Sequence, residues 1–380
     1  MKLIFIIIAV AYLLLFLVRW LLSLIYYKKG KSDVTDFPEE LFTVVQPILS
    51  GDPRLESDLR ANLQQTKTVE FYWLIDQSDT EAQRVANKIC QDELFSQRIR
   101  IFLIEDVPQG INPKSYKIEQ VVEDLTRPYL IVLDDDSVID FSKMGELTAY
   151  LGQEVILTGI PYNQERSNFW SKLVAAFVNG NSLITYFTMA QVEANHSING
   201  MFYILPVNLV KDQDLFTAIK DYLCDDLAVA DFLSSKGVSI VQTRVTRNVR
   251  TTIKSATQYL LQMKRWLLFS SIYLKKHLDF KVFTLIGLTS FLPLPIILLT
   301  LFLGWPYLLV ALVLLLIKAI WMLLYRQSIL MNQLHLDEVL YEVLNDFLLP
   351  WLFLYVLLTP PVINWRGRKI RVTDGKIRYE

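Results

Sequence analysis

The sequence contains few cysteines and histidines, and it has no excess of charge of either sign. Its 380 residues include 2 Cys and 3 His. Cys90 and Cys224 lie far apart, which excludes a disulfide framework and a paired-cysteine metal site. The histidines are equally scattered, so a zinc site would need several carboxylates as ligands. The net charge of -1 excludes an electrostatic nucleic-acid binder, which needs a strong excess of Lys and Arg.

Apolar residues are abundant and are gathered in long segments. The chain is 52% hydrophobic with a mean hydropathy of +0.31, which indicates a membrane-embedded part in addition to a globular one. Residues 3–27 are apolar except for Arg19 and Ser23, and about 20 such residues in a helix span a bilayer. Lys28, Lys29 and Lys31 follow, so the positive-inside rule predicts that the next domain is cytoplasmic.

Further apolar segments lie near the C-terminus. Residues 282–303 carry no charge and residues 305–324 contain only Lys318, which predicts a transmembrane helical hairpin. Residues 347–363 are shorter and contain Pro350, Pro360 and Pro361. A third crossing would place the basic tail at 364–380 outside, whereas a re-entrant or interfacial segment keeps that tail in the cytoplasm. We expect the latter.

The segment between these apolar regions has the composition of a globular domain, with no stretch that we expect to span a bilayer. Short apolar runs at 42–47, 70–75, 99–104 and 129–133 have the length of strands, and helical segments lie between them at 55–65 and 118–125. This alternation predicts an α/β fold with a largely parallel sheet. Ligands bind to such sheets at the carboxyl ends of the strands.

Two of the expected strands end in carboxylates. Asp76 and Asp79 follow the second run, and Asp134, Asp135 and Asp136 follow the fourth. An Asp-x-Asp at a strand end suits Mg²⁺ or Mn²⁺ bound together with a diphosphate, because hard cations prefer oxygen ligands. Strand alternation favours the outer pair of the triplet as the metal ligands. The alternative is a solvated acidic turn that caps a helix.

Two more motifs allow both a structural and a chemical interpretation. Asp225 and Asp226 precede an expected helix at 227–233, where they either cap the helix or remove a proton from an acceptor hydroxyl. Gln262, Arg265 and Trp266 lie in a segment with helical spacing that would run along the membrane surface. There, Arg and Trp are commonly interfacial anchors.

The order of these motifs is more specific than any one of them. Strand-end aspartates, GINPK at 110–114, Asp-x-Asp, paired acidic residues and Q-x-x-R-W before transmembrane helices follow one another. In this order the chain resembles the inverting membrane glycosyltransferases with a glycosyltransferase A-type fold. More narrowly, it looks like the ceramide glucosyltransferases and their bacterial relatives, through QPILSGDPRLESDL at 46–59, GINPK, and NWRGRKIRV at 364–372.

The resemblance implies a role for each motif. Asp76 and Asp79 would contact the nucleotide, and Lys114 would lie near the uridine diphosphate. Asp134 and Asp136 would hold the diphosphate and a Mg²⁺ or Mn²⁺ ion, with the register within the triplet left open. Asp226 would be the general base. Gln262, Arg265 and Trp266 would close over the donor, with Arg265 stabilising the departing diphosphate.

The resemblance also implies an organisation of the chain. We expect a transmembrane anchor at 1–30, a cytoplasmic catalytic domain at 31–253, an interfacial helix at 254–281, a transmembrane and re-entrant region at 282–363 and a basic tail at 364–380. The catalytic domain would have the nucleotide-sugar-binding α/β fold of the family. The protein would be integral to a bacterial inner membrane.

The expected activity is transfer of a hexose, with glucose favoured, from a UDP-sugar to a membrane lipid hydroxyl, with a ceramide-like acceptor favoured. One alternative is a hopanoid or other lipid glycosyltransferase that uses UDP-N-acetylglucosamine. Another is a processive polysaccharide synthase, although that activity usually needs a membrane channel. The non-enzymatic alternative is a membrane-anchored nucleotide-sugar binder whose carboxylates only cap helices. The expected partners are the bilayer, the donor and the lipid, and no nucleic acid.

Overall fold

The computed structural model describes the chain except for residues 30–35, 331–334, 366–367, 374–375 and 380. The chain divides into two compact units. Residues 1–30, 162–195 and 251–364 form the first, which we call the membrane-helix unit. Residues 31–161, 196–250 and 365–380 form the second, which we call the sheet unit.

The sheet unit contains a mixed sheet of 8 strands in the order β3-β2-β1-β4-β7-β6-β8-β5. The first four strands in this order are parallel to one another: β1 (Phe42–Ile48), β2 (Glu70–Asp76), β3 (Ile99–Ile104) and β4 (Tyr129–Leu133). In their register, Val45 lies opposite Tyr72 of β2 and Val132 of β4. These are the four strands expected from the apolar runs, and they confirm the α/β fold.

The other half of the sheet is antiparallel. It consists of β5 (Ser137–Ile139), β6 (Val155–Asn163), β7 (Phe202–Pro206) and β8 (Ser239–Val249). Because β7 runs against β4, Phe202 at the start of β7 pairs with Leu133 at the end of β4. The turn before β7 therefore lies beside the carboxylates that follow β4, and the N–H of Asp134 donates to the carbonyl of Met201 at 3.1 Å.

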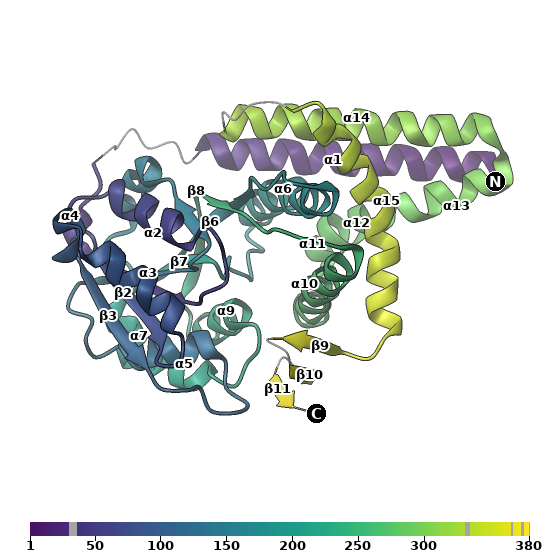
Figure 1. Cartoon of the computed structure of the whole chain (residues 1–380). Helices are drawn as coiled ribbons and strands as arrows, with labels where there is room; N and C mark the ends of the chain where they lie inside the picture. Colours follow the sequence, from purple (N-terminus) through teal and green to yellow (C-terminus); the bar gives the residue numbers. More distant parts are fainter. Residues whose placement is uncertain (30–35, 331–334, 366–367, 374–375, 380) are drawn as a thin grey trace. The chain divides into compact units, whose positions relative to one another are not determined.

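Each face of the sheet has its own apolar core, because successive strand side chains point to opposite faces. Val44 and Trp73 pack with α2 (Leu55–Gln64), α3 (Thr80–Cys90), α4 (Glu93–Ser96) and η2 (Phe141–Tyr150). Val45 and Tyr72 pack with α5 (Pro113–Glu119), α7 (Val207–Asp212), α8 (Leu215–Ile219) and α9 (Asp225–Ser235). Figure 1 shows α2, α3, α4, α5, α7 and α9 around the strands. The helix expected at 118–125 was misplaced: α5 begins five residues earlier and ends at Glu119, and residues 120–124 form turns.

Among its described residues, the membrane-helix unit contains five helices that are long and apolar enough to cross a bilayer. They are α1 (Lys2–Lys29), α6 (Phe169–Gln191), the helical stretch Phe280–Leu303, α14 (Trp305–Leu330) and α15 (Asp337–Leu358). The stretch Phe280–Leu303 comprises α11 (Phe280–Val282), the π-helical turn η3 (Phe283–Leu288), α12 (Thr289–Phe291) and α13 (Pro293–Leu303). Helices α1 and α14 lie side by side (Figure 1). These helices confirm a membrane-associated protein.

Helix α6 was not expected from the sequence, which we read as having no such segment between 31 and 280. Its hydropathy of 1.2 is lower than that of α1, at 2.7, and 67% of its most apolar window is buried inside the protein. Polar side chains are tolerated in such a helix where they have partners. The Asn179 side chain of α6 bonds to both the N–H and the carbonyl of Asn163, at 2.8 and 2.9 Å.

Helix α15 takes the place of the short interfacial segment expected at 347–363. It is one helix of 22 residues that contains Pro350 and begins before the apolar run. Its first half carries Glu342 and Asp346, and Lys318 of α14 lies 2.7 Å from the first and 2.9 Å from the second. This pairing allows the three charges to be buried between helices.

The remaining elements include one long helix, α10, beside shorter elements. They are η1 (Glu39–Leu41), α10 (Ala256–His277), which corresponds to the expected interfacial helix, β9 (Val362–Trp365), β10 (Arg368–Thr373) and β11 (Lys376–Tyr379). The last two strands pair as an antiparallel hairpin, where the sequence suggested only a basic tail. Lys376 of this hairpin donates to Asp221 at 2.7 Å.

Candidate active site

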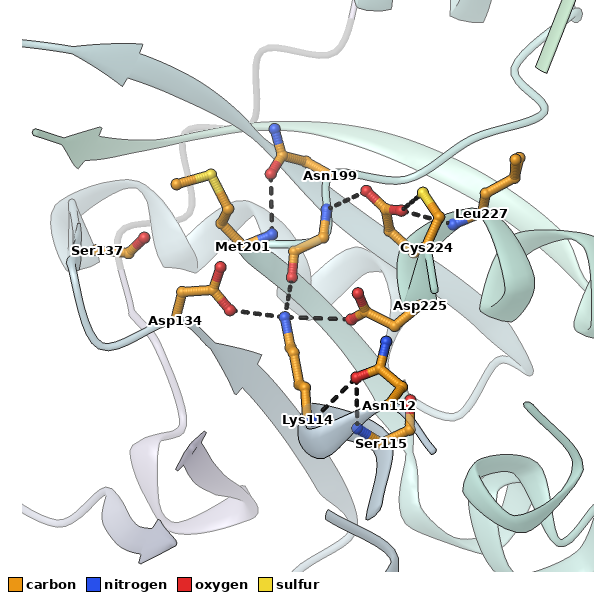
Figure 2. A network of polar contacts seen from close by, with 12 residues as sticks. Asn112, Lys114, Ser115, Asp134, Ser137, Asn199, Met201, Cys224, Asp225 and Leu227 are labelled. Carbon is orange, nitrogen blue, oxygen red and sulfur yellow. Dashed lines mark hydrogen bonds and ion pairs between the residues drawn. The ribbon is translucent and has the colours of Figure 1, made fainter. Parts of the chain in front are cut away.

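The sheet unit brings together most of the residues singled out in the sequence. Asp76 is the last residue of β2, Asp134 follows β4, Lys114 lies in the first turn of α5, and Asp225 and Asp226 begin α9. Figure 2 shows Lys114 pointing between Asp134 and Asp225. The site is therefore at the carboxyl ends of parallel strands, where α/β sheets bind ligands.

The GINPK motif builds the start of helix α5. Gly110 has φ +82°, a conformation that glycine adopts without strain. The Asn112 side-chain oxygen caps the helix by accepting from the N–H of Lys114 at 2.9 Å, and Pro113 occupies the first turn, where its missing N–H costs nothing. The Asn112 amide donates to the carbonyl of Leu223 at 3.0 Å. The motif thus fixes α5 against the segment that leads into α9.

Lys114 is the centre of a partly buried polar network (Figure 2). Its Nζ lies 2.6 Å from Oδ1 of Asp134 and 3.3 Å from Oδ2 of Asp225, and it also donates to the carbonyl of Gly200. Burial alone would favour a neutral amine, but the charges of Asp134 and Asp225 outweigh it and raise the pKa of Lys114. The site therefore holds a fixed ammonium group between β4 and α9.

A second lysine of α5 reaches the neighbouring strand. Lys117, three residues after Lys114, is buried, and its Nζ lies 3.0 Å from Oδ2 of Asp76. Residues three apart lie on the same face of a helix. One short helix therefore places a cation at the end of β2 and another at the end of β4.

Asp79 has a structural role in this arrangement. Its carboxylate caps α3 by accepting from the N–H of Ala82 at 3.0 Å, and it also accepts from the N–H of Ser50 at 2.8 Å. Burial opposes ionisation, but these two N–H groups outweigh it and lower the pKa of Asp79. The capping interpretation therefore holds for Asp79, and its contact with a nucleotide stays a prediction.

The three aspartates after β4 have different partners. Asp134 faces Lys114, Asp135 accepts from the N–H of Leu49 at 2.7 Å, and Asp136 accepts from the hydroxyl of Ser137 at 3.3 Å. Burial, together with the neighbouring carboxylates, raises the pKa of Asp135 to about 7 and that of Asp136 to about 6.

These aspartates alone do not make a complete metal cage. Among the residues that the structure describes, no group of three or more His, Cys, Asp or Glu side chains is placed to hold a metal ion. Mg²⁺ is commonly held by only one or two carboxylates together with the phosphates of a substrate. The triplet fits a cation of that kind, and the choice of Asp134 and Asp136 as its ligands stays a prediction.

Asp225 and Asp226 are neighbours with different surroundings. Asp226 accepts from the N–H of Gly200 at 3.1 Å through Oδ2, and from the N–H of Leu227 at 2.8 Å through Oδ1. Asp225 instead pairs with Lys114. Burial raises the pKa of Asp225 to about 6 in spite of that lysine. Cys224, whose pKa burial also raises, donates its thiol hydrogen to Asp226 at 2.8 Å.

The turn at Asn199 and Gly200 belongs to the site, although the sequence analysis did not include it. Gly200 donates its N–H to Asp226 and accepts from Lys114 through its carbonyl. It therefore links the Asp226 carboxylate to the Lys114 ammonium group. The Asn199 side chain accepts from the guanidinium of Arg247 at 2.6 Å and from the N–H of Met201 at 3.1 Å, which holds the turn in place. The Asn-Gly dipeptide was the signal available in the sequence, because it marks turns. Nothing comparable marks Arg247 on β8.

Gln262, Arg265 and Trp266 lie on α10 in the membrane-helix unit. The Arg265 guanidinium donates to the Gln262 side chain at 3.2 Å, and Trp266 stacks on Phe177 of α6 with ring centroids 5.7 Å apart. The structure thus brings these three residues together on one helix. Their roles at the donor stay predictions.

Comparisons with known proteins give a match along nearly the whole chain. The sequence model of glycosyl transferase family 21 matches residues 1–378. A solved structure of the mannosyltransferase PcManGT from Pyrobaculum calidifontis, in complex with GDP-Man and Mn²⁺, is 13% identical and covers 90% of this chain and 99% of its own, with a TM-score of 0.48. S. aureus TarS 1–349 in complex with UDP-GlcNAc is 12% identical and covers 89% of this chain and 99% of its own, with a TM-score of 0.40. The comparison with curated proteins gives no match.

Proposed function

The chain belongs to glycosyl transferase family 21, and on that basis we propose that it transfers a hexose, with glucose favoured, from a UDP-sugar to the hydroxyl of a membrane lipid. The family is that of ceramide glucosyltransferase. Membership of this family favours a ceramide-like lipid as the acceptor. The observation that carries the proposal is the partly buried ammonium of Lys114, which is paired with Asp134 and Asp225 beside Asp226 at the strand ends.

The geometry supports a single displacement. Asp226 takes the proton of the lipid hydroxyl, whose oxygen forms a bond to the anomeric carbon while the bond from that carbon to the diphosphate oxygen breaks. UDP leaves with the electron pair, and Lys114 supplies positive charge for it. Because the base and the leaving group act on opposite sides, one such step inverts the anomeric centre.

The partners of the two carboxylates favour Asp226 over Asp225 as the base. Asp225 is held by Lys114, whereas Asp226 is held by backbone N–H groups and a thiol. We therefore assign proton removal to Asp226 and the positioning of Lys114 to Asp225. A Mg²⁺ or Mn²⁺ ion at Asp134 and Asp136 would supply further charge for the diphosphate when bound. Arg265 is proposed to stabilise the departing diphosphate, and Gln262 and Trp266 to close over the donor.

A transfer assay tests the proposed function. The purified full-length protein in lipid is incubated with labelled UDP-sugars and with ceramide, hopanoid or total lipid extracts, and the products are separated and identified. We expect a labelled glycolipid with inverted configuration from UDP-glucose and ceramide. Labelled hopanoid from UDP-N-acetylglucosamine, or an insoluble polymer, would point to one of the other transferases. Binding of the UDP-sugar without any product would contradict an enzymatic role.

Gly200→Ala is expected to impair the site without unfolding the sheet unit. A Cβ at this position would lie 2.7 Å from Oδ2 of Asp226, so the carboxylate has to move. We expect the transfer rate to fall roughly 10-fold or more, because small displacements of catalytic groups are costly. Gly287→Ala is the matched control, since its Cβ would meet only Phe283, at 3.6 Å. Equal rates for both variants would show that the position of Asp226 is not critical.

The sheet unit is proposed to lie in the cytoplasm of a bacterial cell. Lys28 and Lys29 end α1, and Lys275 and Lys276 end α10, which the positive-inside rule places on the cytoplasmic side. Protease added to intact spheroplasts is expected to leave the sheet unit uncut, and permeabilised cells provide the control. Cleavage of the sheet unit from outside would overturn this topology.

A further inference from the structure

Arg247 of β8 is a fully buried arginine in the sheet unit, with an exposed fraction of 0%. Val245 and Val249, two residues away on either side, are buried too, and alternation along a strand places the three side chains on one face. Arginine is almost never fully buried in a protein unless its charge has partners. An apolar side chain would fill this position without the cost of burying a charge. The partners of Arg247 therefore indicate its role.

One half of the guanidinium contacts the segment that follows β4. Nη1 of Arg247 donates to the Ser137 hydroxyl at 2.8 Å, and that hydroxyl donates to Oδ1 of Asp136 at 3.3 Å. A serine hydroxyl has one hydrogen and two lone pairs, so both bonds can form at once. Because a guanidinium can only donate, Ser137 has to accept from it, and the hydroxyl hydrogen stays available for Asp136. Arg247 therefore fixes the direction in which Ser137 donates.

The other half of the guanidinium contacts the turn before β7. Nη2 of Arg247 donates to Oδ1 of Asn199 at 2.6 Å, and this oxygen also accepts from the N–H of Met201 at 3.1 Å (Figure 2). Two donors on one oxygen settle which way the Asn199 amide faces, because its nitrogen cannot accept. Gly200 lies between these two residues and donates to Asp226. Arg247 thus supports the turn from which Asp226 is held.

From these contacts we propose that Arg247 is a positioning residue that ties Asp136 to the turn that holds Asp226. Asp136 is the proposed ligand of the cation and the diphosphate, and Asp226 is the proposed base. These two roles rest on the proposed function, whereas the contacts of Arg247 do not. A guanidinium is planar and presents its donors in a rigid fork, so it holds its two partners at fixed relative positions. Because Arg247 is fully buried, it acts through Ser137 and Asn199 and not by touching a substrate.

Three variants cut this link at different places. Ser137→Ala removes the acceptor on the donor side, Asn199→Ala removes the acceptor in the turn, and Arg247→Met removes both contacts while it fills the space with an apolar side chain. Asn199→Asp is the conservative variant, because a carboxylate oxygen can still accept from both donors. Arg244→Met is the matched control, since Arg244 lies on the same strand and pairs with Glu146 at 2.7 Å instead.

Two measurements on the full-length protein in detergent report the two ends of the link. The rise in Tm with UDP in the presence of Mn²⁺ gives the UDP affinity, and single-turnover transfer at saturating donor gives the rate. We expect Ser137→Ala to weaken UDP binding roughly 10-fold and Asn199→Ala to lower the rate roughly 10-fold, the effect of about one lost hydrogen bond. Arg247→Met is expected to do both. Asn199→Asp and Arg244→Met are expected to do neither.

A merely structural role for Arg247 predicts a different pattern. Arg247→Met would then lower the Tm without ligand, but its UDP affinity and transfer rate would equal those of Arg244→Met, and this result would overturn the proposal. Equal losses of affinity and rate in Ser137→Ala and in Asn199→Ala would also overturn it, because each variant cuts only one end of the link. Asn199→Ala should add less to Arg247→Met than to the wild type, since both remove the same hydrogen bond.

Hydrogen exchange separates this inference from the proposed function. If the wild type makes no glycolipid, the proposed function fails, and exchange of the Gly200 N–H replaces the transfer rate as the measure of the turn. Faster exchange together with weaker UDP binding in Arg247→Met, and neither change in Arg244→Met, would support the link without any transfer. Exchange at the wild-type rate in Arg247→Met would overturn it.

Discussion

Asp226→Asn lowers the rate of sugar transfer roughly 1,000-fold, within the range that general acid-base catalysis contributes, and leaves the affinity for the UDP-sugar close to that of the wild type. A lipid hydroxyl is a poor nucleophile until a base takes its proton, whereas donor binding depends on the diphosphate contacts of Lys114. The asparagine keeps one oxygen for the N–H of Gly200 or Leu227, so the fold is expected to survive. Single-turnover transfer and donor titration measure the two effects.

Asp225→Asn is the matched control, because it changes the neighbouring residue in the same way. Asp225 contacts Lys114, so its loss is expected to weaken donor binding more than it slows transfer. The assignment of the base would be wrong if Asp226→Asn transferred at the wild-type rate, or if it lost donor affinity in parallel with rate. Asp225 would then be the next candidate, since its pKa of about 6 suits a base at neutral pH.

The parallel half of the fold is predictable because each of its strands is marked by a short segment of the sequence itself. β1 to β4 are short apolar runs bounded by polar residues, and their bounds agree with the sequence to within a residue. The strand-end position of Asp76 and Asp134 follows directly. The antiparallel half is less predictable, because β5 has only three residues and pairs with β8, which is distant in the sequence. That half supplies the Gly200 turn, so the contacts of Lys114 and Asp226 with that turn could not be anticipated.

The buried charges of the membrane-helix unit show a second limit. Lys318 appears isolated in the sequence, because Glu342 and Asp346 lie outside the apolar segment expected at 347–363. Only the packing of α14 on α15 brings Lys318 within 3 Å of each of these carboxylates. The same holds for α6, whose Asn179 weakens the hydropathy signal but bonds to the Asn163 backbone inside the protein. Composition cannot distinguish a polar residue that has a partner from one that faces lipid.

Removal of divalent cations with a chelator is expected to abolish transfer. Asp134→Ala and Asp136→Ala are each expected to lower the transfer rate at least roughly 100-fold. The reason is that a bound cation stabilises the charge that develops in the transition state by several kcal/mol. Mg²⁺ or Mn²⁺ should restore the chelated wild type. Asp140→Ala is the control, since this partly exposed carboxylate contacts Ser142 and Lys143 instead. Full activity in chelator, or wild-type rates in both variants, would remove the metal assignment.

Thermal unfolding separates a metal site from a structural acidic turn. If Asp136 only crowds Asp135, Asp136→Ala relieves repulsion between like charges, and the Tm holds or rises whether or not metal is added. If Asp134 and Asp136 bind a cation with the diphosphate, Mn²⁺ and UDP together raise the Tm of the wild type, and the increase disappears in either variant. Asp134→Ala also takes one carboxylate from Lys114, whereas Asp136→Ala does not. A metal-dependent increase in Tm that is lost in both variants therefore cannot be attributed to the Lys114 ion pair alone.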